Sequence, residues 1–177
     1  LAVAAALAFS TWMVSLLRVD ASLADRIWPL MIAGAGWAYA VARPDAGPLA
    51  GAVLTIATLW ALRLALFLTW RNWGAGEDRR YRAMRERHAP HFPLRSLVIV
   101  FALQAVLAWL VSAPLLAAHA GPAPGLVAWA GGALALFGVV YEAVADAQMA
   151  RFRADPAHRG QVMDRGLWRH TRHPNYF

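Results

Sequence analysis

The feature that most constrains the fold of this chain is a series of apolar runs separated by clusters of arginine. A transmembrane helix needs roughly 20 mostly apolar residues, and runs near this length lie at 1–17, 27–42, 47–70, 97–119 and 124–147. Lipid offers the backbone no hydrogen-bond partners, so each run is expected to be a helix. The sequence predicts an all-α integral membrane bundle with five spans, forming one polytopic domain over residues 1–177.

Composition and charge support this class. The chain is 60% apolar and only 15% charged, which is atypical of a soluble domain with a solvated surface. Segment 71–95 holds seven Arg against three acids, and segment 151–172 holds six against two. Basic residues in alternate loops mark the cytoplasmic side. We therefore expect a bacterial inner-membrane protein with its N-terminus outside, and the pattern argues against nucleic-acid binding.

The ends of the chain suggest a longer protein. The first residue is Leu rather than Met, and Tyr176-Phe177 is typical of a lead into another apolar helix. We expect the chain to be truncated at both ends.

Arg63 is a charge inside the run 47–70. A charge at this depth costs about 3 kcal/mol on insertion scales, so it usually faces a partner or a wet cavity. The alternative is that its long side chain extends toward the span's end at Arg71.

Glu142 and Asp146 are four residues apart, so both project from one helix face, with Arg153 close to the same stripe. Two carboxylates near lipid repel each other unless cations or polar ligand groups share the site. Arg63, Arg71, Arg153 and Arg172 are candidate cations. The pair predicts either a ligand site or an ion-pair network that fixes helix packing.

Two basic segments are candidate anion sites. In 74–82, Asp78 is expected to stabilise a helix start, and the arginines beside Tyr81 suit a phosphate. In 172–176, Pro174 is expected to begin a helix whose first amides, with Arg172 and His173, favour an anion. Asn175 adds an amide there. The neighbouring arginines disfavour a metal ion, so no metal site is predicted.

These segments together resemble a known family. The chain is similar to the steroid 5-alpha-reductase family, and more closely to its bacterial integral-membrane branch of unknown function, over residues 60–177. The residues that carry the resemblance are Trp60, Arg63, Arg71, Glu77-Asp78-Arg79-Arg80-Tyr81, Glu142, Asp146, Gln148, Gly166-Leu167-Trp168 and Arg172-His173-Pro174-Asn175-Tyr176-Phe177.

The resemblance implies a seven-helix membrane enzyme that uses NADPH to reduce the C=C bond of an enone-type lipid or sterol-like substrate. It implies cofactor binding by one set of residues: Arg63, Arg71, Glu142, Asp146, Arg153, Arg172, His173, Asn175 and Tyr176. The carbonyl-polarising Glu and Tyr of the steroid enzymes are absent from the second and third spans. Asp25 and Trp60 are the catalytic candidates in their place.

Two other functions stay open. Methyltransferases of the isoprenylcysteine and phospholipid type, which use S-adenosylmethionine, share an Arg-His-Pro-x-Tyr element before a helix. The chain is alternatively a non-catalytic membrane scaffold or lipid-handling protein, whose intramembrane polar residues serve packing alone.

Overall fold

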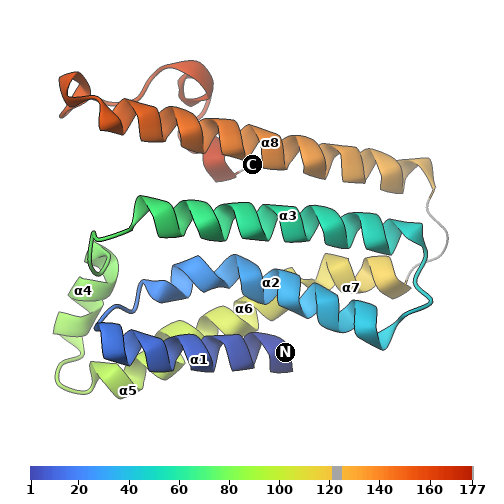
Figure 1. Cartoon of the computed structure of the whole chain (residues 1–177), viewed down its shortest axis with the longest axis horizontal. Helices are drawn as coiled ribbons and strands as arrows, with labels where there is room; N and C mark the ends of the chain where they lie inside the picture. Colours follow the sequence, from blue (N-terminus) through green and yellow to red (C-terminus); the bar gives the residue numbers. More distant parts are fainter. Residues whose placement is uncertain (121–124, 177) are drawn as a thin grey trace. The chain divides into compact units, whose positions relative to one another are not determined.

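The computed structural model describes residues 1–120 and 125–176, and every regular element in these ranges is helical. Two compact units are present, Leu1–Pro124 and Gly125–Phe177, and each is described by itself (Figure 1). The first contains α1 (Ala2–Arg18), α2 (Leu23–Ala42), α3 (Pro48–Arg71), α4 (Arg79–Arg87), α5 (Phe92–Ser96), the π-helix η1 (Leu97–Ala102), α6 (Leu103–Val111) and α7 (Ala113–Ala120). The second contains α8 (Leu126–Ala154) and the short 3-10 helices η2 (Pro156–His158), η3 (Gly166–Arg169) and η4 (Pro174–Tyr176).

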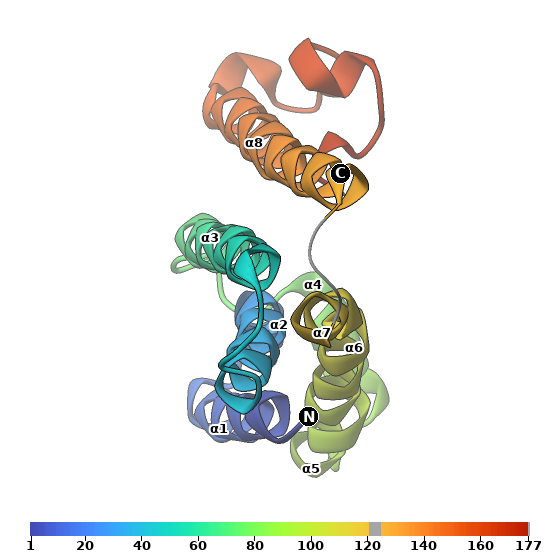
Figure 2. The ribbon, with the colours of Figure 1, turned by 90° about the vertical axis from the view of Figure 1, so that its right-hand side faces the viewer.

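Helix α2 is the centre of the first unit. It packs between α1 and α3, and α6 lies against both α1 and α2 (Figures 1 and 2). The buried core joins small residues with a few large side chains, among them Met31 and Phe101. Small residues allow helix backbones to approach closely, which favours association where packing is the main attraction.

Gly36 is the point of closest approach on α2. A Cβ atom at this position would lie 2.8 Å from a Leu115 methyl on α7 and 2.9 Å from a Leu54 methyl on α3. A partly buried hydrogen bond between the Tyr39 and Ser112 hydroxyls, at 2.8 Å, links α2 to the end of α6 nearby. This end of the bundle therefore depends on a glycine on α2.

Three of the helical segments are long and apolar enough to cross a membrane, by length and composition. They are Pro48–Arg71, Phe92–Ala120 and Leu126–Ala154, and they coincide with the predicted runs 47–70, 97–119 and 124–147. Residue 124 itself lies outside the described residues. The predicted runs 1–17 and 27–42 are helices too, but α1 is only 17 residues long and α2 is not among the three candidate spans. The predicted count of five spans is therefore not confirmed.

Two boundaries differ from those predicted. Helix α2 begins at Leu23, so Asp25 lies in its first turn and not in the preceding loop. Helix α8 continues past residue 147 to Ala154, because Gln, Met, Ala and Arg are good helix formers. It ends at Asp155, since the residue before a proline is pushed out of the helical region.

The second unit is one long helix with a return segment. After η2 the chain runs back along α8, and both η3 and η4 contact it (Figure 1). The return segment is residues 155–176 from here on.

We expect Gly36→Val to destabilise the first unit, because the new methyl groups must displace Leu54 and Leu115. Overpacking of this kind typically costs about 1–3 kcal/mol. Thermal unfolding in detergent measures the effect. Gly51→Val on α3 is the control, because no atom beyond the neighbouring residues and nearby backbone of α3 lies within 4 Å of a Cβ built there. An equal loss of stability in both variants would contradict the packing argument.

Candidate functional site

The Asp25 carboxylate joins three helices of the first unit. Its Oδ1 accepts hydrogen bonds from the Tyr81 hydroxyl at 2.6 Å and from Gln104 Nε2 at 3.2 Å. Its Oδ2 accepts one from Arg80 Nη2 at 2.9 Å. Asp25 is on α2, Arg80 and Tyr81 are on α4, and Gln104 is on α6. In this arrangement Asp25 acts as an acceptor.

Helix α4 is held in place by two acids that precede it. Asp78 caps its N-terminus, since the carboxylate accepts the Arg80 backbone N–H at 2.9 Å, and the predicted stabilisation of a helix start is confirmed. Glu77 accepts the Ala21 backbone N–H at 2.8 Å and two hydrogen bonds from Arg85, at 2.7 and 2.9 Å. Glu77 thus ties the loop between α1 and α2 to α4.

Burial and hydrogen-bond partners set the protonation states of Tyr81 and Glu77. Burial, and then the hydrogen bond to Asp25, raise the pKa of the Tyr81 hydroxyl, so it stays a donor at neutral pH. Burial opposes ionisation of Glu77, but the hydrogen bonds from Arg85 and Ala21 outweigh it and lower the pKa of that carboxyl. Glu77 is therefore ionised at neutral pH.

Gln104 is a functional candidate that the sequence prediction missed. Its Nε2 donates to both Asp25 and the Tyr81 oxygen, the latter at 3.1 Å. Its Oε1 is buried and, among the described atoms, has no hydrogen-bond partner. The available signal was that Gln104 is the one amide within the apolar run 97–119, because a polar side chain inside a span usually faces other polar groups.

In the second unit the structure brings Asp146 and Asn175 together. Asn175 Nδ2 donates to Asp146 Oδ1 at 3.2 Å. Glu142 lies one helical turn before Asp146, and both acids are buried, with 8% and 5% of their surface exposed. On the predicted acidic face of α8, the return segment therefore places an amide against Asp146.

Three further contacts dock the return segment on α8. The Leu167 backbone N–H donates to Gln148 Oε1 at 2.9 Å, and the Trp168 indole N–H donates to the Ala145 carbonyl at 2.9 Å. Gly166 lies directly on the Gln148 amide with φ of 57°, a left-handed conformation that favours glycine. A Cβ atom at Gly166 would lie 2.5 Å from Gln148 Oε1.

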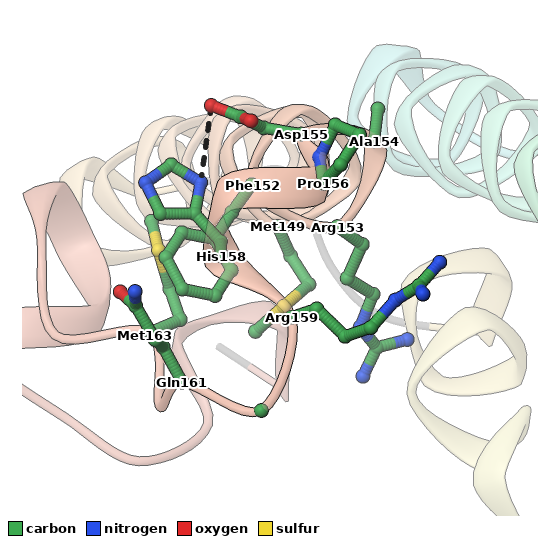
Figure 3. A pocket seen from close by; sticks show the side chains of 11 residues that line it. Met149, Phe152, Arg153, Ala154, Asp155, Pro156, His158, Arg159, Gln161 and Met163 are labelled. Atoms are coloured by element: carbon green, nitrogen blue, oxygen red, sulfur yellow. Dashed lines mark ion pairs between the residues drawn. The ribbon is translucent and has the colours of Figure 1, made fainter.

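A cavity of about 380 Å³ lies where α8 turns into the return segment (Figure 3). Its wall contains a stacked pair, Phe152 and His158, with ring centroids 4.3 Å apart and planes at 11°. The lining residues are Met149, Phe152, Arg153, Ala154, Asp155, Pro156, His158, Arg159, Gly160, Gln161 and Met163. Of the predicted cofactor residues, Arg153 lies in this cavity.

The other predicted residues of the first unit lie on α3. Trp60 is partly buried against the core. Arg63 is half-buried within the span. Arg71 is exposed at the helix end, where its Nε donates to Asn72 Oδ1 at 3.2 Å.

The remaining predicted residues lie near the end of the return segment. Arg172 and His173 are exposed, and the His173 backbone N–H donates to the Thr171 hydroxyl at 3.4 Å. Pro174 is buried and begins η4, which is a three-residue 3-10 helix and not the regular helix expected from the sequence. The Tyr176 side chain is outside the described part of the structure.

A sequence model described as a protein of unknown function, DUF1295, matches residues 11–177. The chain belongs to the DUF1295 family. No curated protein and no solved structure matches it. The family match covers both units, so the Asp25 cluster and the Asp146–Asn175 pair both lie within the DUF1295 region.

The cavity residues of this DUF1295 chain were largely missed by the sequence prediction. Arg159, Phe152 and His158 follow no metal or nucleotide motif, and they meet only because the chain turns at Asp155-Pro156. The available signal was two arginines flanking a helix stop in a segment with few acids.

We expect the stability of this DUF1295 protein to fall with acidification in a way that depends on Glu77. Folding lowers the pKa of Glu77, so its contribution is complete above the ordinary value of about 4.3 and is lost as pH falls through the folded-state value. Melting temperatures measured from about pH 6 down to about pH 2 should decline less steeply for Glu77→Gln than for the wild type. Glu86→Gln, which changes an exposed acid on α4, should keep the wild-type slope. Parallel curves for Glu77→Gln and wild type would exclude Glu77 as the source.

We expect Gly166→Ala to loosen the return segment more than Gly160→Ala does. Both glycines have positive φ, of 57° and 80°, so both variants incur about 1–2 kcal/mol of backbone strain. Only at Gly166 must the new methyl also displace Gln148 and break its hydrogen bond to Leu167. Hydrogen exchange of the Leu167 amide reports this loss. Equal exchange in the two variants would show that the Gln148 contact is not a docking point.

Proposed function

We propose that this protein is an NADPH-dependent membrane reductase that transfers a hydride to the C=C bond of an enone-type lipid or sterol-like substrate. The observation that best supports the proposal is the contact between Asn175 and Asp146, with Glu142 buried one turn away. The resemblance to the steroid 5-alpha-reductases assigned these three residues to the cofactor. Two of them meet although 29 positions separate them in the chain.

The chemistry of this group suits a polar ligand with several hydrogen-bond donors. A carboxylate is stable in a buried position only where donors or cations surround it, so two buried carboxylates make this face of an apolar helix a polar site. Carboxylate oxygens accept hydrogen bonds from ribose hydroxyls and from a carboxamide, and the Asn175 amide can both donate and accept. NADPH carries all of these groups.

NADPH, when bound, supplies the hydride for the β-carbon of the enone. The chain's part is to orient the two reactants and polarise the substrate carbonyl, and the α-carbon then takes up a proton from water. We assign carbonyl polarisation to the indole N–H of Trp60, a hydrogen-bond donor. Asp25 accepts three hydrogen bonds, so we assign it the positioning of Tyr81, Arg80 and Gln104.

The proposal includes the membrane arrangement expected from the sequence. Five helices of this chain span the bilayer in this arrangement. The N-terminus is outside the bacterial inner membrane, and the Arg-rich segments 71–95 and 151–172 are cytoplasmic, where NADPH is available. Arg63 and Arg71 of α3 are the cofactor residues that the resemblance assigns to the first unit.

Thermal shift of the protein purified in detergent tests the function. A ligand that binds only the folded state at 100 times its Kd stabilises by about 2.7 kcal/mol, a shift on the order of 5 °C for a chain of this size. We expect this shift with NADPH in the wild type and its loss in Asp146→Asn and Asn175→Ala. Asp164→Asn, which removes an exposed charge from the return segment, should retain it.

The outcomes separate the three functions. A shift with S-adenosylmethionine and none with NADPH would replace the reductase with a methyltransferase. No shift with either ligand, together with lower melting temperatures in Asp146→Asn and Asn175→Ala, would favour a scaffold in which these residues serve packing. A shift with NADPH warrants screening of enones by consumption of NADPH absorbance.

A further inference from the structure

The cavity at the end of α8 carries a net positive charge on its wall. Among its described lining residues, Asp155 is the one acid, and it is already engaged (Figure 3). Its Oδ2 lies 3.5 Å from His158 Nδ1, and its Oδ1 accepts the Ala157 backbone N–H at 2.9 Å. Arg153 and Arg159 line the same cavity, on the side away from the His158–Asp155 pair.

The turn that presents Arg159 is held by several contacts. The backbone N–H of Arg159 donates to the Pro156 carbonyl at 3.2 Å, and the Gln161 side chain donates to the Ala157 carbonyl at 3.0 Å. The His158 ring is stacked on Phe152, which is 9% exposed and belongs to α8 itself. These contacts fix the backbone of Arg159 relative to that of Arg153, so little ordering is needed before both can bind one ligand.

We infer that this cavity binds a phosphate group through Arg153 and Arg159. A guanidinium presents planar pairs of N–H donors that match phosphate oxygens, and its charge is retained at any relevant pH. Two arginines against one acid, whose Oδ1 already accepts a backbone hydrogen bond, leave the wall with the positive charge that attracts a phosphate dianion. The volume of about 380 Å³ is within the range of small-molecule sites.

The phosphate has two possible sources, a soluble nucleotide and a lipid headgroup. Arg153 is seven residues beyond Asp146 on α8, a rise of about 10 Å, which a dinucleotide can span. The nucleotide source extends the proposed function and rests on it. The phosphate site itself does not rest on it, because the argument uses only the cavity and its charges.

Binding of three probes to the same variants tests the inference. The probes are inorganic pyrophosphate, NADPH and phosphatidic acid, with affinity measured by titration for the first two and lipid retention by native mass spectrometry for the third. Arg159→Gln and Arg153→Gln each remove hydrogen bonds to a charged group, which should weaken binding about tenfold or more. Arg151→Gln is the matched control, because Arg151 is exposed on the same helix and is not in the cavity.

Each outcome decides between the sources or overturns the site. Weaker binding of pyrophosphate and NADPH in both cavity variants, with Arg151→Gln unchanged, supports the nucleotide source. Weaker retention of phosphatidic acid with no binding of NADPH supports a headgroup site and removes the reductase proposal while leaving this inference standing. Equal affinity of all three variants for every probe, or no binding of any probe by the wild type, overturns it.

Discussion

The interaction on which the polar end of the first unit depends is the Asp25 carboxylate. It gathers Arg80 and Tyr81 of α4 and Gln104 of α6 onto the first turn of α2. A buried donor left without its acceptor costs about 1–3 kcal/mol, so loss of this one carboxylate would affect three helices at once. Glu77 does the same for the loop between α1 and α2. The basic segment 71–95 is ordered through these two acids.

In the second unit, too, polar groups on one helix hold a separate segment in place. Most side chains of α8 are apolar and cannot hydrogen-bond the return segment. The acceptors that do so are the side chains of Asp146 and Gln148 and the backbone carbonyl of Ala145. Docking there places the Asn175 amide against the acidic face. The helix stop at Asp155 folds two arginines around a cavity at its end. The proposed hydride-transfer ligand and the proposed phosphate site are therefore organised by one rigid element.

Much of the helical framework was predictable because it depends on local sequence. The three candidate spans match predicted runs, since the length of an apolar run is a local property set by bilayer thickness. The capping role of Asp78 was predictable for the same reason, because a cap acts within one turn. The extension of α8 to Ala154 was not predicted. The apolar run ends at residue 147, but the residues that follow are good helix formers and continue the helix.

The sequence by itself determined the helical class, the three spans and the shared face of Glu142 and Asp146, because each follows from spacing along one helix. Only the tertiary structure decided which partners these residues meet. Tyr81 and Gln104 lie 56 and 79 positions from Asp25, and Asn175 lies 29 positions from Asp146. These pairs form where the loops bring distant segments together. The spacing of residues along one helix does not indicate which distant segment that helix will contact. The cavity of Arg153 and Arg159 exists for the same reason, through the turn that follows α8.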